Sequence, residues 1–285
     1  MLYLLLSIFC SVSVGVIFKI ARTHNVSSGQ VVGFNYVFAL LLSFLFFPVD
    51  FTVLNASAPW QIYLPLMVML PSVFLVLALS IRHVGIVRTD AAQRLSLFIP
   101  ILAAWLIFKE EFNTYKVLGL CIGLPALALI LSKKADKPAK EWAYPALVLI
   151  GFGVIDTLFK QIALIKTVPY TTSLFIIFCG ALVITIVAVC YELIFLKKKL
   201  NPMNFAYGAL VGIFNFGNIL FYLKAHKAFA ENPSTVFAAM NMGVIVLGSL
   251  VGIVIFKEKL SGRNYVGIAL ALVAIVFITL SQIYK

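Results

Sequence analysis

The chain has 285 residues, of which 63% are hydrophobic and 11% charged, and its formal net charge is +12. Because a soluble domain carries about 25% charged residues, this composition excludes a protein that is surrounded by water. The lysines and arginines stand between long apolar runs, where loop cations orient a membrane protein against anionic lipid. We therefore expect the basic charge to serve the lipid bilayer, and we expect no nucleic-acid partner.

No motif for catalysis, cofactor binding or metal binding occurs. The chain contains no P-loop, HExxH or GxSxG, so we expect neither an ATP-driven pump nor an enzyme, and no cofactor. The four cysteines lie inside apolar runs without a CxxC motif, which indicates small packing residues and not a disulfide frame or a metal site. These cysteines are Cys10, Cys121, Cys179 and Cys190.

Ten apolar segments are long enough to cross a bilayer as helices, which takes about 20 residues each. The first segment lacks a basic region before it and a small-x-small cleavage site after it, so we expect it to stay in the mature protein. We predict an all-α integral membrane protein with ten transmembrane helices. The segments are 2–20, 29–48, 61–82, 90–108, 114–132, 143–165, 171–196, 204–223, 233–256 and 264–283.

An internal repeat divides the ten segments into two halves. IFKEEFNTYKVLG, from Ile107 to Gly119, returns as IFKEKLSGRNYVG from Ile255 to Gly267. Two further matches follow: VIFKIA in the first segment resembles TLFKQIA in the sixth, and Gln93 falls opposite Asn241. An odd number of spans per half inverts the second half in the membrane. We predict two inverted five-helix repeats, 1–132 and 142–285, joined by the polar linker 133–141.

Small residues recur at four-residue spacing in several segments. Such pairs let helix backbones approach closely in lipid. We expect intramolecular packing from most of them, and a homodimer contact through one such face is the alternative to a monomer. The pairs are Gly119/Gly123, Gly208/Gly212, Gly248/Gly252 and Gly267/Ala271.

The chain resembles the drug/metabolite transporter superfamily, and its EamA-type branch most closely. Ten helices, an aromatic-Lys pair late in the first helix of each half and the duplicated hinge carry the resemblance. Two positions depart from the family pattern: the hinge reads Phe-Lys-Glu instead of Gly-Glu, and the first helix lacks Trp-Gly. The resemblance implies export or exchange of small metabolites through a central cavity in a bacterial inner membrane, with no chemistry on the substrate.

Charged side chains inside the spans mark candidate functional positions, because inserting one costs at least about 2.5–3.5 kcal/mol. Asp156 and Lys160 are four residues apart on one helix face. Asp156 is the candidate for proton coupling, and a structural ion pair with Lys160 is the alternative. Lys19 matches Lys160, so we expect both to line the cavity, unless the Lys19 ammonium extends to the headgroups.

Gln93 and Arg94 lie one turn inside the expected start of the fourth segment, where Asp90 is expected as the helix cap. An Arg94 that faces the cavity would bind a carboxylate or phosphate through two donors. An Asp90–Arg94 pair at the membrane surface is the open alternative.

Four asparagines complete the expected binding site. They either line one cavity wall or form interhelical hydrogen bonds, which are worth about 0.6 kcal/mol on average. These residues are Asn35, Asn215, Asn218 and Asn241.

Three functions fit this sequence to different degrees. The leading hypothesis is a secondary active transporter that exports small organic metabolites such as amino acids, by alternating access to a cavity between the repeats. A sugar-phosphate or nucleotide-sugar exchanger is the main rival, favoured if Lys19, Arg94 and Lys160 converge. A membrane-embedded lipid-handling enzyme or assembly factor is the runner-up from another class.

Orientation in the membrane has two opposing indications. The linker and the Lys197–Lys199 run carry most loop cations, so the positive-inside rule places both termini outside. The family resemblance implies cytoplasmic termini. On the residue count, we expect a C-terminal alkaline phosphatase fusion to be active; an inactive phosphatase and a fluorescent C-terminal fluorescent-protein fusion would contradict this orientation.

Overall fold

The structure is a computed structural model that describes residues 2–24, 26–52, 58–96, 98–99, 102–103, 113–131, 142–165, 167–228 and 233–284. Ten α-helices and no strand occur in these ranges. Six of the helices are long and apolar enough to cross a bilayer, and three others contain shorter apolar stretches. The prediction of an all-helical membrane protein is confirmed, and the chain is a multi-pass integral membrane protein.

The helices lie close to the predicted segments. The fourth begins four residues earlier than expected, and most of the predicted span after Leu95 lies outside the described residues. In chain order the elements are α1 Leu2–Ala21, η1 Arg22–His24, α2 Ser28–Phe46, α3 Trp60–Val84, α4 Ile86–Leu95, α6 Thr114–Leu131, α7 Ala143–Leu164, α8 Tyr170–Ile194, α9 Pro202–Ala228, α10 Pro233–Leu250, the π-helical turn η3 Val251–Ile255 and α11 Gly262–Ile283.

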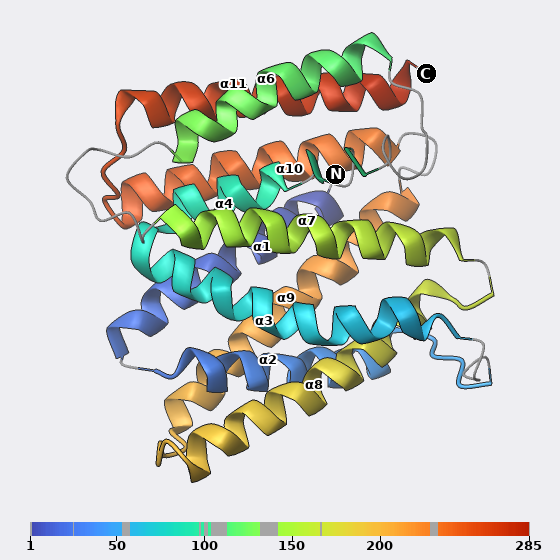
Figure 1. The fold of residues 1–285 in the computed structure, drawn as a ribbon, viewed down its shortest axis with the longest axis vertical. Coiled ribbons are helices and arrows are strands. Elements are labelled where there is room, and N and C mark those ends of the chain that lie inside the picture. The colour runs from blue at the N-terminus through green and yellow to red at the C-terminus, as the bar shows by residue number, and fades with distance from the viewer. Residues whose placement is uncertain are drawn as a thin grey trace.

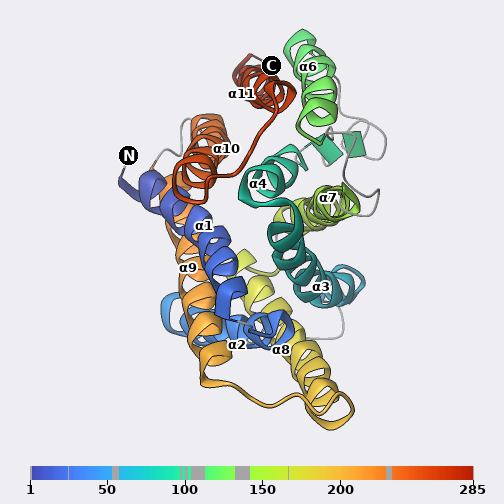
Figure 2. The ribbon, with the colours of Figure 1, turned by 90° about the vertical axis from the view of Figure 1, so that its left-hand side faces the viewer.

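Eight helices form a closed ring. Around the ring each helix contacts the next, in the order α1, α9, α2, α8, α3, α7, α4, α10 and back to α1. Figure 2, seen along the helices, shows α1 with α9 facing α3 with α7, while α2 with α8 and α4 with α10 complete the ring. The pair α6 and α11 packs together outside it.

One end of the bundle, here called the Glu258 end, gathers most of the loop cations. Lys19 at the end of α1 pairs with Glu258 before α11, and Ser27 before α2 donates a hydrogen bond to Glu192 near the end of α8. This end is on the left in Figure 1. The described basic residues at this end include Arg82, Lys197, Lys198, Lys199, Lys257, Lys259 and Arg263.

The opposite end, here called the Tyr284 end, holds both chain termini (Figure 1). Thr171 donates a hydrogen bond to the Pro48 carbonyl, which joins the start of α8 to the α2–α3 connection. Asn113 before α6 donates to the Tyr284 carbonyl at 2.7 Å. Two termini at one end agree with an even number of crossings.

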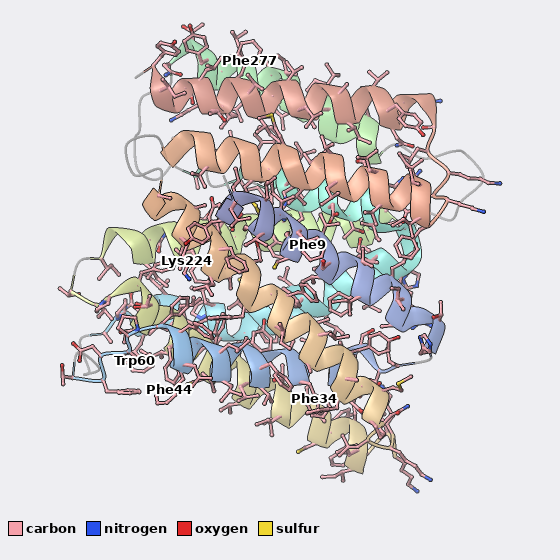
Figure 3. All side chains as sticks on the ribbon, turned by 180° about the vertical axis from the view of Figure 1, so that it is seen from behind. Phe9, Phe34, Phe44, Trp60, Lys224 and Phe277 are labelled. Atoms are coloured by element: carbon pink, nitrogen blue, oxygen red, sulfur yellow. The ribbon has the colours of Figure 1, made fainter. Side chains whose placement is uncertain are left out.

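The outer surface is apolar, as a lipid-facing surface must be. Phe9, Phe34 and Phe44 are visible on the outside in Figure 3, and Phe9 and Phe44 are more than half exposed. Trp60 and Lys224 both lie at the Tyr284 end, and the Lys224 ammonium lies 5.8 Å from the centre of the Tyr3 ring. Such an arrangement suits the boundary between lipid and water.

The small-residue pairs pack inside the chain. A Cβ atom built on Gly208 would lie 2.9 Å from the Val31 carbonyl oxygen, and one on Gly212 would lie 2.8 Å from that of Asn35, so these glycines let α9 approach the backbone of α2. A Cβ on Gly248 would meet the Asp90 carboxylate of α4. The predicted intramolecular role is confirmed for these residues, whereas the homodimer stays a prediction.

Candidate functional site

Arg94 lies in the last turn of α4 and faces the interior of the ring. Its Nη2 donates a hydrogen bond of 2.7 Å to Ser11 Oγ on α1. It also interacts electrostatically with Asp156 on α7 and Tyr222 on α9. Groups from four ring helices therefore meet at one guanidinium, and Asp90 also interacts with it electrostatically, so the Asp90–Arg94 pair stays a prediction beside the cavity role.

Asp156 shares this interior space. Ser96 Oγ donates a weak hydrogen bond of 3.4 Å to Asp156 Oδ2, and Tyr170 at the start of α8 interacts with the carboxylate electrostatically. Its neighbour Ile155 is buried, yet Asp156 itself is exposed to solvent. Because Ser96 directly after α4 and Tyr170 of α8 both lie beside the carboxylate, it faces the interior of the ring.

The guanidinium of Arg94 retains unused donor capacity. Its Nε is buried and has no hydrogen-bond partner among the described residues, although the side chain as a whole is half-buried. A buried donor without a partner costs about 1–3 kcal/mol, so a ligand oxygen that supplies the missing bond gains that free energy on binding. Arg94 and Asp156 thus present one cation and one anion to the same space.

Asp90 does not cap α4, so that prediction is wrong. The helix begins at Ile86 and its N-cap is Gly85, whose φ of +95° is easily reached only by glycine. Asp90 lies one turn further in, is 5% exposed and faces Gly248 on α10. Within the described part of the chain, its Oδ2 has no hydrogen-bond partner. The sequence did not indicate this start, because the side chain that accepts from the first backbone N–H of α4 belongs to Glu258, 172 residues away from Ile86.

Lys19 lies outside the Arg94–Asp156 centre in this conformation. Its Nζ is 3.2 Å from Glu258 Oε1 and 5.9 Å from the centre of the Phe256 ring. Substrate contact by Lys19 stays a prediction. The side chain of Lys160 lies outside the described part of the structure, as does most of the first hinge.

The asparagines are distributed over two helix interfaces. Asn215 donates a hydrogen bond of 3.2 Å to Asn35 where α9 meets α2. Asn218 accepts one of 2.8 Å from Ser7 where α9 meets α1. Asn241 is buried on α10. In this structure Asn35, Asn215 and Asn218 therefore form hydrogen bonds between helices. Gln93, the remaining polar candidate, is half-buried and directly precedes Arg94.

Sequence reasoning found the two charged residues of the centre and missed most of their partners. Ser11, Ser96 and Tyr170 are ordinary residues in apolar helices, and nothing in one sequence distinguishes them from packing residues. Glu258 belongs to the second copy of the repeated hinge. Its reach to α4 depends on tertiary packing, which the repeat pattern does not contain.

Comparison with known proteins agrees with this architecture. Residues 1–132 match the EamA-like transporter family. An uncharacterized protein of Haemophilus influenzae (strain ATCC 51907 / DSM 11121 / KW20 / Rd) is 41% identical over 283 residues, which cover 95% of this chain and 95% of its own. A crystal structure with 17% identity shares the fold, with a TM-score of 0.60 over 99% of this chain and 98% of the other. Residues 1–132 are thus an EamA-like transporter family domain, which is consistent with the drug/metabolite transporter superfamily.

Proposed function

We propose that this protein is a secondary active transporter that exports small organic metabolites, such as amino acids or related zwitterions, from a bacterial cell across its inner membrane. One observation carries the substrate class: Arg94 and Asp156, which come from different halves of the sequence, interact electrostatically inside the helix ring. The EamA-like match over residues 1–132 supports a transporter, and we expect no chemistry on the substrate.

The helix contacts support the two inverted repeats on which alternating access depends. Replacing each helix of the first five by its counterpart in the second five exchanges α1 with α7, α2 with α8, α3 with α9, α4 with α10 and α6 with α11. The order of contacts around the ring is unchanged by this exchange. The family match also ends at residue 132, where we expect the first repeat to end.

A zwitterion fits the charges of this centre. The Arg94 guanidinium has donors for a carboxylate, and its unpartnered Nε is one of them. The Asp156 carboxylate accepts only the weak bond from Ser96 among the described hydrogen bonds, so it can accept from a ligand ammonium. An electrically balanced ligand adds no net charge to a low-dielectric site, which limits the cost of desolvation.

The rival anion exchanger has weaker support. It was favoured by three cations converging on the cavity, but Lys19 is occupied by Glu258 in this state. Arg94 also faces Asp156 across the site, and a carboxylate would repel a phosphate ester. Whether Lys160 pairs with Asp156 stays a prediction, because the Lys160 side chain lies outside the described residues.

Replacing Arg94 with alanine tests the carboxylate site. Losing charge-assisted hydrogen bonds worth about 1.5–3 kcal/mol should weaken binding about 10- to 150-fold, while the protein still accumulates in the membrane. The measurement is transport in proteoliposomes of a metabolite that raises the melting temperature of the purified protein. Arg263→Ala, on the exposed surface at the Glu258 end, is the matched control. Unchanged transport by Arg94→Ala would leave Arg94 with a structural role only.

Replacing Asp156 with asparagine tests proton coupling. The asparagine amide does not gain or lose a proton near neutral pH, so any dependence of transport on a pH gradient should vanish while substrate-driven exchange persists. Asp50→Asn, in the exposed α2–α3 connection, is the control and should retain the dependence. Proteoliposomes with imposed pH gradients provide the measurement, and an Asp156→Asn protein that still responds would remove Asp156 from the coupling mechanism.

A further inference from the structure

Helix α3 bridges the ring, because it contacts both α1 and α2 across it. The corresponding helix α9 makes no comparable contact with α7 or α8 among the described residues. The contacts of α3 include the pair Phe18 and Phe74, and Phe18 directly precedes Lys19. The bridge by α3 therefore closes the Glu258 end of the described bundle.

The carboxylate of Glu258 binds three groups at the closed end. Its Oε1 accepts a hydrogen bond of 2.7 Å from the Ile86 backbone N–H, and its Oε2 accepts one of 3.2 Å from Val87 N–H. The same Oε1 lies 3.2 Å from Lys19 Nζ. The exposed fractions of these side chains are 9% for Glu258 and 19% for Lys19. One carboxylate thus joins the α10–α11 loop, the start of α4 and the end of α1.

Two glycines make room for this carboxylate. A Cβ atom on Gly85 would lie 2.5 Å from Glu258 Oε2, and one on Gly252 would lie 3.3 Å from the same atom. The Glu258 N–H donates to the Gly252 carbonyl at 3.0 Å, and Lys257 adopts a positive φ of 51° to turn the chain. The loop is therefore shaped to hold Glu258 against α4, where negative charge is favourable at a helix N-terminus.

Apolar packing closes the same region. Phe18, which precedes Lys19, has its ring centre 6.1 Å from that of Phe74 on α3, and Phe74 also contacts Tyr36 on α2. The remaining pocket between α1, α2 and α3 has a volume of about 160 Å³ and includes Ser28 and Ala78 in its lining. Ligand sites commonly have about 300–1,000 Å³, so this route is too narrow for a metabolite.

We propose that Glu258 is the latch of this closed end: its ion pair with Lys19 and its cap on α4 hold α1 and α4 together, and both must break when the transporter opens here. This inference rests on the proposed alternating-access function. It assigns Lys19 and Glu258 to the conformational change and leaves Arg94 and Asp156 to the substrate.

Helix α4 connects the latch to the binding centre. Arg94 lies eight residues beyond Ile86, which corresponds to about 12 Å along a helix. Asp90 lies between them and interacts electrostatically with both Arg94 and Glu258. A ligand that changes the charge balance at Arg94 therefore acts on the helix whose N-terminus Glu258 holds. Lys19 and Glu258 are positioning residues in this account.

Cysteine labelling tests the latch without any substrate. The native cysteines are replaced, and single cysteines are introduced at Ala78 in the closed pocket or at Phe159, about one turn beyond Asp156. The rate of reaction with a water-soluble maleimide is measured in purified protein. We expect Glu258→Gln to raise the rate at position 78 about tenfold and to lower the rate at position 159.

A rise in the labelling rate at position 78 together with a fall at position 159 distinguishes a latch from a purely structural role of Glu258. A loosened or misfolded protein would label faster at both positions, and that result would overturn the proposal, as would no change at either. Lys19→Gln leaves the contact of Glu258 with α4 in place, so it should change both labelling rates in the same directions but by less. This variant keeps the test valid if Glu258→Gln does not fold.

Glu192→Gln is the matched control. Glu192 is also a partly buried acid at this end, with an ion pair of 3.0 Å to Lys198, but its described partners do not include α4. We expect unchanged labelling in this variant. Labelling needs no substrate. If the predicted rate changes did not occur, the latch would be overturned and the Arg94–Asp156 proposal would still stand. If the substrate proposal were wrong, the predicted labelling rates would be unaffected.

Discussion

The contact between the Glu258 carboxylate and the first N–H groups of α4 determines where the fourth helix begins. With that cap in place, α4 starts at Ile86, which buries Asp90 and brings Arg94 into the interior of the ring. Without a tertiary cap, the polar run from Arg88 to Arg94 would have its best helix start at Thr89 or Asp90, close to the membrane surface. A loop from the second half therefore positions the main cation of the binding centre in the first half.

The sequence repeat separates two kinds of polar residue. Lys19 and Glu258 have identical counterparts in the other half, Lys160 and Glu110. By the same alignment, Arg94 falls opposite Met242 and Asp156 falls opposite Gly15, so both charges of the binding centre occur once. A conformational change that both halves share needs equivalent residues in each. A small asymmetric substrate needs residues that break the symmetry, as Arg94 and Asp156 do.

Composition and periodicity predicted the all-helical membrane fold well, because bilayer thickness fixes the length of a spanning helix. They also identified Arg94 and Asp156, since a charge inside an apolar segment is conspicuous. The start of α4 was predicted four residues late, and Ser11 and Tyr170 were missed. Both failures concern contacts between residues far apart in the chain. A local cap signal at Asp90 was outweighed by Glu258, and uncharged polar residues acquire their role only from neighbours.

The account stands on the claim that Arg94 and Asp156 bind one ligand that carries both charges. The direct measurement is the thermal stability of purified protein against a panel of amino acids, their amides, their N-acylated forms and sugar phosphates. A ligand at 100 times its Kd stabilises the folded state by about 2.7 kcal/mol. We expect at least one free zwitterion to raise the melting temperature, and its amide and N-acyl forms to have little effect. Stabilisation by sugar phosphates without any response to zwitterions would contradict the account.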